Sequence, residues 1–147
     1  MRERVAALEI ERARIREMGG PDKVAKQHER GKLTARERLV QFFDGGNFFE
    51  VGLHGTQMGQ GSEKDKPPAD AVICGYGEVN GRMVAAAAYD FTVKGGSIGY
   101  TGEVKVTRMR ELALRCRMPM VWFIDSAGAR IDPQGAMSGD NISLFAG

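Results

Sequence analysis

The sequence predicts an α/β domain preceded by a helical arm, and three patterns support this fold class. Helical periodicity dominates residues 1–44, and a β-hairpin pattern with Asn80-Gly81 at its turn follows. The chain then runs through a strand, a Gly-rich turn, a helix and a second strand. This order is typical of a βαβ crossover, which places two parallel strands in one sheet with a right-handed connection. We therefore expect a helical arm over residues 1–44 and an α/β part over residues 45–147.

The arm is predicted to contain three helices. The first has a narrow apolar stripe and ends at Gly19-Gly20-Pro21, so it needs a partner to pack against. The second is expected from Asp22 to Arg30. Thr34 and Glu37 form a capping-box pattern that opens the third, which continues through Phe43. The stripe of the first helix consists of Val5, Leu8, Ile15 and Met18.

A short strand, a long loop and a hairpin are predicted to follow the arm. The strand is Phe48 to Val51, and Gly59 to Ala69 has the composition of a mobile loop. Ala71 to Val79 and Arg82 to Tyr89 form the hairpin, because the intervening Asn-Gly pair favours a type I′ turn. The second hairpin strand is small and apolar on both faces, so we expect it to be packed on two sides.

The crossover helix is expected from about Glu103 to Cys116. The hydrophobic run Val121 to Ile124 predicts a buried strand after it. The residues that recur at helical spacing, and that should face the sheet, are Val106, Met109, Ala113 and Cys116.

Composition and charge narrow the classes of protein that fit. No apolar run approaches the roughly 20 residues of a membrane span, and the charged N-terminus does not resemble a secretory signal, so we expect a cytoplasmic protein. Cys74 and Cys116 lack metal or disulfide spacing and are predicted core residues. His28 and His54 are predicted surface groups, and we expect no metal. Interleaved charges in the arm indicate a solvated helix rather than a nucleic-acid site.

Two Gly-rich turns follow two predicted core strands. One is Lys94 to Gly99 and the other is Ser126 to Arg130. Ligands of α/β sheets bind at the carboxyl ends of strands, so the two turns could converge on one site. The first turn also leads to a helix N-terminus, where an anion is favoured. The alternative is that the glycines only permit tight turns.

Side-chain catalysts are missing from these turns. The sequence has no phosphate-binding loop pattern, and Ser126 lies in no nucleophile-elbow pattern. Any catalysis here must depend on backbone donors around a developing negative charge. Such donors form an oxyanion hole, and loss of one costs roughly 100- to 1,000-fold in rate.

Three segments carry a family resemblance: QHERGKLTARERL (Gln27 to Leu39), YDFTVKGGSIG (Tyr89 to Gly99) and FIDSAGARI (Phe123 to Ile131). They resemble the N-terminal half of the carboxyltransferase subunit of biotin-dependent acyl-CoA carboxylases, of the propionyl-CoA carboxylase β type. The resemblance implies a crotonase-like fold, a spiral of ββα repeats. Family subunits are several-fold longer, so residues 45–147 are expected to be the first part of a truncated carboxyltransferase domain that is inactive by itself.

The resemblance also implies an activity and site residues. The carboxyl group passes from carboxybiotin to the α-carbon of a short acyl-CoA through enolates held by backbone oxyanion holes. Ala127, Gly128 and Ala129 are expected to approach the CoA thioester with their main chain. Arg130 has two interpretations: a bridge from its loop to nearby carboxylates, or a contact to CoA phosphates. The other residues expected to line the crevice are Lys94, Gly95, Gly96 and Ser126.

The implied partners are a biotin-carrying α-subunit and further copies of the chain. The resemblance implies a hexamer, which is the usual oligomer of the family. Ala127 departs from the family, which commonly has glycine there, and this puts the size of the acyl pocket in question. Two alternatives stay open. One is the α-subunit of a sodium-pumping acyl-CoA decarboxylase, with membrane partners, and the other is a non-catalytic acyl-CoA-binding or assembly module.

Overall fold

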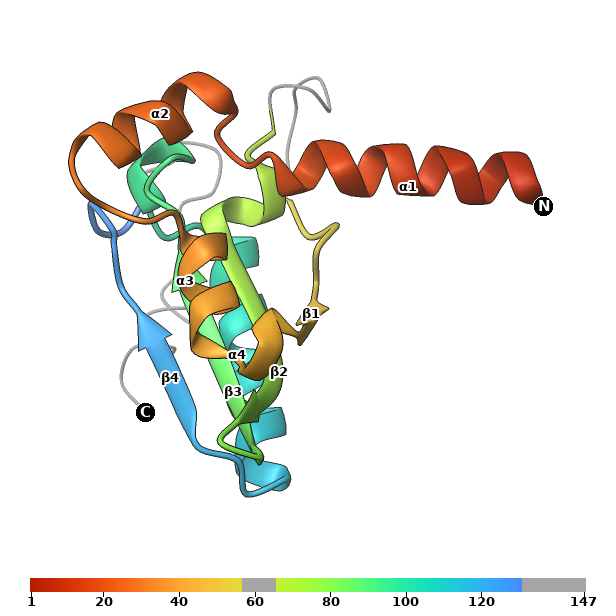
Figure 1. The fold of residues 1–147 in the computed structure, drawn as a ribbon, viewed down its shortest axis with the longest axis vertical. Helices are drawn as coiled ribbons and strands as arrows, with labels where there is room; N and C mark the ends of the chain where they lie inside the picture. Colours follow the sequence, from red (N-terminus) through yellow and green to blue (C-terminus); the bar gives the residue numbers. More distant parts are fainter. Residues whose placement is uncertain (57–65, 131–147) are drawn as a thin grey trace.

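The computed structural model describes residues 1–56 and 66–130, which form a four-stranded sheet between helices (Figure 1). The strand order is β1-β2-β3-β4, antiparallel except for the parallel β3–β4 pair. No helix in these two ranges is long and apolar enough to cross a membrane. The elements are α1 (Arg2–Arg16), α2 (Pro21–Glu29), α3 (Ala35–Phe42), β1 (Phe48–Val51), β2 (Val72–Val79), β3 (Arg82–Tyr89), α4 (Tyr100–Arg115) and β4 (Met120–Phe123), with short turns η1 (Asp44–Gly46), η2 (Pro68–Ala71) and η3 (Lys94–Gly96).

Strand β3 is packed on both faces, as its composition predicts. Ala86 and Ala88 belong to a core cluster shared with α3, whereas Ala85 and Ala87 belong to a cluster shared with α4. All four alanines are 0% exposed. Because successive side chains of a strand point to opposite faces, small residues on both allow helices to approach from both sides.

The hairpin and the capping box are confirmed. Asn80 and Gly81 have φ of 52° and 71°, as a type I′ turn requires, and Val79 pairs with Arg82. The Asp44 carboxylate accepts both turn N–H groups at 3.0 Å, which ties the end of the arm to the hairpin. At the start of α3, the Glu37 N–H donates to Thr34 Oγ1, and the Thr34 N–H donates to Glu37 Oε2.

Helix α1 is packed only at its C-terminal end. Ile15 and Met18 are buried, but Val5 is 53% exposed and Leu8 is 41% exposed. The helix projects away from the rest of the fold (Figure 1), so nothing in the described chain covers its first turns. The described residues therefore supply a packing partner for Ile15 and Met18 but none for Val5 and Leu8, and the partner expected for that end of the stripe stays a prediction.

Strand β4 and one cysteine also differ from expectation. Trp122 is 46% exposed and Ile124 is 70% exposed, because β4 lies at the edge of the described sheet and pairs with β3 alone. Cys116 is exposed because it follows the last turn of α4, whereas Cys74 is buried. Burial raises the pKa of the Cys74 thiol to about 11. The predicted loop from Gly59 lies outside the described residues up to residue 65.

The crossover agrees with the sequence prediction. Strands β3 and β4 are parallel, with Ala85 opposite Met120, and α4 connects them. Helix α4 begins at Tyr100, three residues before the expected start. The turns η2 and η3 precede β2 and follow β3, so both lie at the same end of the sheet and contact each other.

Candidate functional site

The two Gly-rich turns meet at the carboxyl ends of β3 and β4, as predicted. The Ala127 N–H donates to the Gly95 carbonyl at 2.9 Å, and the Ile98 N–H donates to the Gly128 carbonyl at 2.9 Å. The Arg130 N–H returns a bond to the Ile98 carbonyl at 2.8 Å. A short parallel bridge between Ile98 and Ala129 therefore joins the two segments. We call residues 126–130 the exchange loop.

The glycines of η3 allow this close approach of backbones. Gly96 has φ of 64°, and a Cβ there would lie 2.2 Å from the Asp125 carbonyl oxygen. Gly95 has φ of 65°, and a Cβ there would lie 3.5 Å from the Cβ of Ala127. Lys94 precedes them with φ of 47° and an exposed side chain. Gly96 thus packs against main chain, and its predicted contact with a ligand stays a prediction.

The main-chain N–H groups in and beside the exchange loop differ in whether they have a hydrogen-bond acceptor. Ala127 uses its N–H on Gly95, and the Gly128 N–H donates to Ser126 Oγ at 3.0 Å. Within the described ranges, the N–H groups of Gly95 and Ala129 have no acceptor. Ala127 and Ala129 are exposed, and a Cβ on Gly128 would meet none of the described residues within 4 Å. The loop therefore presents open main chain to a ligand.

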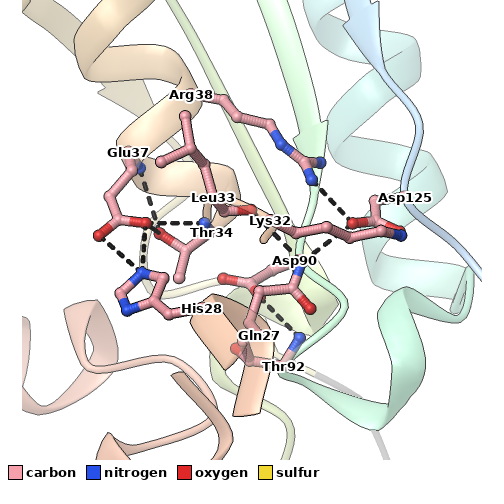
Figure 2. Close-up of polar contacts among 10 residues, drawn as sticks. All are labelled: Gln27, His28, Lys32, Leu33, Thr34, Glu37, Arg38, Asp90, Thr92 and Asp125. Atoms are coloured by element: carbon pink, nitrogen blue, oxygen red, sulfur yellow. Dashed lines mark hydrogen bonds and ion pairs between the residues drawn. The ribbon is translucent and has the colours of Figure 1, made fainter. Parts of the chain in front are cut away.

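Three residues of the arm hold the start of the exchange loop through the Asp125 carboxylate (Figure 2). Arg38 Nη2 donates to Asp125 Oδ2 at 2.8 Å, and Gln27 Nε2 donates to the same oxygen at 3.0 Å. Lys32 Nζ donates to Asp125 Oδ1 at 3.2 Å. Gln27 is itself buried, and its Nε2 also donates to the Leu33 carbonyl.

These contacts change the acidity of Asp125. Burial, the largest single effect, raises the pKa of Asp125, but hydrogen bonds from Arg38, Lys32 and Gln27 together outweigh it and hold the pKa below its ordinary value. The carboxylate is therefore charged at neutral pH. The sequence contained Asp125 at the end of a strand, but no local pattern indicated that three arm residues would contact it.

A second buried carboxyl group, Asp90, follows β3 (Figure 2). Thr92 donates to Asp90 Oδ1 from its N–H at 2.8 Å and from its hydroxyl at 2.6 Å. Thr92 Oγ1 in turn accepts from the Gly19 N–H at 3.2 Å, which links the segment between α1 and α2 to the end of β3. Burial raises the pKa of Asp90 above its ordinary value, against the opposing hydrogen bonds from Thr92.

Arg130 closes the other end of the exchange loop. Its Nη1 donates to Asp70 Oδ1 at 2.5 Å, its Nε donates to Ser97 Oγ at 3.2 Å, and its Nη2 donates to the Ser97 carbonyl at 2.9 Å. The first interpretation of Arg130, a bridge to a carboxylate, describes this contact. Sequence reasoning missed Asp70, because 60 residues separate it from Arg130 and it lies beside a predicted loop.

Asp70 also occupies the helix N-terminus that the sequence indicated as a place for an anion. The Gly102 N–H, in the first turn of α4, donates to Asp70 Oδ2 at 2.6 Å. A Cβ on Gly99, the N-cap residue, would lie 2.7 Å from both Asp70 oxygens. A carboxylate at a helix N-terminus interacts favourably with the helix dipole. The anion at this position is therefore one of the protein's own side chains.

Other features lie away from the two turns. A groove of about 640 Å³ lies between α1 and β1, and its lining includes Arg12, Arg16 and His54 but no residue of either turn. His28 and His54 are exposed, and His28 Nε2 pairs with Glu37 at 2.9 Å. Among the residues that the structure describes, no three histidine, cysteine or acidic side chains are grouped as metal ligands.

Known proteins of one family are similar to this chain in sequence and fold. The methylmalonyl-CoA carboxyltransferase 12S subunit of Propionibacterium freudenreichii subsp. shermanii is 46% identical over 99% of this chain and 28% of its own length. A propionyl-CoA carboxylase carboxyltransferase subunit of Haloferax mediterranei is 42% identical over 89% of this chain and 26% of its own. The methylmalonyl-CoA decarboxylase subunit alpha of Veillonella parvula is 40% identical over 89% of this chain and 26% of its own length.

A solved structure has the same fold. The crystal structure of transcarboxylase 12S with methylmalonyl-coenzyme A bound superposes with a TM-score of 0.89 at 42% identity, over 99% of this chain and 28% of that chain. The predicted crotonase-like carboxyltransferase fold is thereby confirmed. The chain spans about a quarter of the length of the curated relatives it matches. Residues 26–146 match the family described as the carboxyl transferase domain, and the chain therefore belongs to that family.

Proposed function

We propose that this chain is the acyl-CoA-binding part of a carboxyltransferase that carboxylates the α-carbon of a short acyl-CoA such as propionyl-CoA. The observation that carries this proposal is the exchange loop, whose exposed main chain lies at the carboxyl ends of two parallel strands. Relatives named for propionyl-CoA and methylmalonyl-CoA support the substrate class. Nothing in this arrangement requires a side-chain nucleophile.

The acyl thioester would lie against the exchange loop. Removal of an α-proton leaves negative charge on the thioester oxygen, and N–H groups aimed at that oxygen stabilise it. Ala129 and Gly95 have N–H groups without acceptors among the described residues, so we assign this role to them first. The open space at Gly128 allows the thioester and pantetheine to approach the main chain. When carboxybiotin is bound, the α-carbon would bond to the carboxyl carbon as the bond from that carbon to biotin breaks, and the α-proton would pass to biotin.

The remaining predicted site residues receive supporting roles. We assign Ser126, through its bond to the Gly128 N–H, to the shape of the loop, and Gly96 to the close contact of the two turns. Lys94 is exposed, and we assign it to meet the negative charge of CoA. For Arg130 the contact with Asp70 favours the bridging role over a contact to CoA phosphates.

Biotin, carried by a partner subunit, would supply the carboxyl group when bound. The open main chain of the exchange loop fits a thioester, and we assign biotin binding to another part of the assembly. A related 12S structure is described as a hexamer, which supports an oligomer of this chain. A biotin-carrying α-subunit is the partner that the carboxylase function requires.

A biotin-dependent decarboxylase is the second candidate function. Two relatives named methylmalonyl-CoA decarboxylase subunit alpha are 40% and 37% identical to this chain. The chemistry at the acyl group is the same in reverse, because the same enolate forms when the carboxyl group leaves. The exchange loop serves both directions equally.

The test uses the native protein, purified at the length at which the cell makes it. Carboxyl transfer from carboxybiotin to propionyl-CoA is expected, with acetyl-CoA as the matched comparison substrate. Stable co-purification with a biotin-carrying subunit would support the carboxylase, and sodium-dependent loss of the carboxyl group from methylmalonyl-CoA would support the decarboxylase. Binding of propionyl-CoA without either reaction would favour a non-catalytic binding module.

A further inference from the structure

The turn η2 has an unusual backbone for residues other than glycine. Ala69, Asp70 and Ala71 have φ of 49°, 48° and 61°, which places three successive non-glycine residues in the left-handed region. A non-glycine residue in this region is strained, and it persists only where its surroundings hold it. The same turn contacts η3, which carries Lys94, Gly95 and Gly96 in left-handed conformations.

Two groups hold η2 in this conformation. Lys105 Nζ, on α4, donates to the Ala69 carbonyl at 2.7 Å and to the Val72 carbonyl at 2.6 Å. The Asp70 N–H donates to the Pro67 carbonyl at 3.1 Å. The result is that the Asp70 side chain, 0% exposed, points at the N-terminus of α4 and at Arg130.

Both oxygens of Asp70 are committed. Oδ2 accepts from the first turn of α4, which fixes the carboxylate in the fold, and Oδ1 accepts from Arg130, which is the last residue of the exchange loop. The side chain of Arg130 is 10% exposed, and its Nε and Nη2 donate to Ser97. Asp70 therefore connects the first turn of α4 to the loop that the proposed function places against the thioester.

We propose that Asp70 is a positioning residue for the transfer reaction: through Arg130 it sets the exchange loop at its distance from η3. This inference rests on the proposed function. Asp125 fixes the start of the loop from the arm, and Asp70 fixes its end from η2, so Ala127, Gly128 and Ala129 lie between two anchors, with Ala127 and Ala129 exposed. Asp70 touches no reacting atom and acts only through Arg130.

The experiment compares Asp70→Asn, Arg130→Gln and the double variant in the native full-length protein. Asparagine keeps the shape of Asp70 but loses the charge that Arg130 binds. A displacement of about 1 Å at reacting groups can cost roughly 100-fold in rate. We expect each single variant to lower kcat by about 10- to 100-fold, with a smaller change in KM for propionyl-CoA. The double variant should lose no more than the larger single loss, because both changes break one connection.

A matched control separates positioning from general stability. Glu50 pairs with Arg36 through two bonds of 3.0 Å on β1, at the other edge of the sheet from β4. Glu50→Gln is expected to lower the Tm by an amount similar to Asp70→Asn while kcat stays within twofold. If Asp70→Asn does not fold, the neutral pair Asp70→Asn with Arg130→Gln is compared with Arg130→Gln alone, and equal kcat values are expected.

A second measurement does not depend on activity. Amide hydrogen exchange of the peptide that covers residues 125–130 should speed up at least tenfold in Asp70→Asn, and stay unchanged in Glu50→Gln. Unchanged kcat and unchanged exchange in a folded Asp70→Asn protein would overturn the inference, as would multiplied losses in the double variant. Absence of carboxyl transfer in the wild-type protein would instead overturn the proposed function. The rate of amide hydrogen exchange would still decide whether Asp70 positions the loop.

Discussion

Arg38 Nη2 lies 2.8 Å from Asp125 Oδ2, although 87 residues separate the two in sequence. Arg38 belongs to α3 and Asp125 follows β4, so this ion pair joins the helical arm to the exchange loop. Both side chains are largely buried, with 20% and 11% of their surface exposed. The arm therefore contributes to the site, in addition to covering one face of the sheet.

Breaking this pair should destabilise the protein and disturb the site. For Arg38→Gln we expect a loss of about 1–3 kcal/mol in the free energy of unfolding, because a largely buried carboxylate loses a charged donor. Lys32→Gln is the control: Lys32 bonds to the same carboxylate, but its side chain is 51% exposed, and a surface pair contributes about 0–1 kcal/mol. Urea unfolding of both variants measures the difference. Equal losses would contradict the assignment of Arg38 as the main anchor.

The lowered pKa of Asp125 predicts that the stability of the fold decreases in acid. Its pKa is lower in the folded state than in the unfolded chain, so its stabilising contribution is present above the unfolded pKa and is lost as the pH falls through the folded pKa. We expect the Tm of the wild-type protein to fall below about pH 4 more steeply than the Tm of Asp125→Asn. Thermal unfolding from pH 7 to pH 3 tests this, and parallel curves for the two proteins would contradict it.

The raised pKa of Asp90 predicts the opposite trend, a contribution to stability that decreases as the pH rises. Its pKa is raised in the fold by burial, so the folded state holds a proton that the unfolded state gives up as the pH rises through the ordinary carboxyl range. The charged form of Asp90 therefore lowers the free energy of unfolding at neutral pH. Asp90→Asn should raise the Tm at pH 7 relative to the wild type, with a smaller gain near pH 4. A lower Tm of Asp90→Asn at pH 7 that disappears near pH 4 would show that the charge on Asp90 stabilises the fold, and would contradict this prediction.

Gly96→Ala should damage the contact between the two turns. The added Cβ would lie 2.2 Å from the Asp125 carbonyl oxygen, and φ of 64° is unfavourable for alanine. We expect a loss of at least about 1–3 kcal/mol in stability, together with loss of carboxyl transfer. Gly81→Ala is the control, since φ is also positive there but a Cβ meets nothing within 4 Å. If both variants lost the same stability, steric contact with Asp125 would not be the reason for Gly96.

The two ends of α1 should respond differently to substitution. Ile15 is 5% exposed, so Ile15→Ala should cost about 2–5 kcal/mol in the free energy of unfolding. Leu8 is 41% exposed, so Leu8→Ala should change the stability by about 0.5 kcal/mol or less in a monomer. Denaturant unfolding at low protein concentration measures both, and a large loss for Leu8→Ala there would contradict the exposed position of Leu8.

Local patterns predicted most of the fold. The capping box, the Asn-Gly turn and the small residues of β3 act over a few residues, and each predicted element is present within a few residues of its expected bounds. Burial was harder to predict for Trp122, Ile124 and Leu8. Their hydrophobicity indicates a partner surface, but hydrophobicity does not indicate whether the same 147 residues supply it.

The candidate site was predicted in part. Strand ends with glycines indicated that the turns meet, because the carboxyl ends of parallel strands share one edge of a sheet. The anchors could not be predicted in this way. Asp70 and Asp125 contact residues 60 and 87 positions away, and such pairs depend on the complete packing of η2, α3 and α4. The N–H group of Ala127 was also expected to be available to a ligand, but it donates a hydrogen bond to the Gly95 carbonyl.

The most direct test of the account is carboxyl transfer by the native full-length protein carrying Gly128→Val. Gly128 has φ of 106°, and none of the described residues lies within 4 Å of a Cβ built there, so valine would fill the surface that we assign to the thioester. Ala127→Gly, which changes the neighbouring residue without adding bulk, is the control. We expect Gly128→Val to lose at least about 100-fold in kcat/KM for propionyl-CoA, with a circular dichroism spectrum that shows the fold is kept. Wild-type turnover in Gly128→Val, with an unchanged KM for propionyl-CoA, would contradict it.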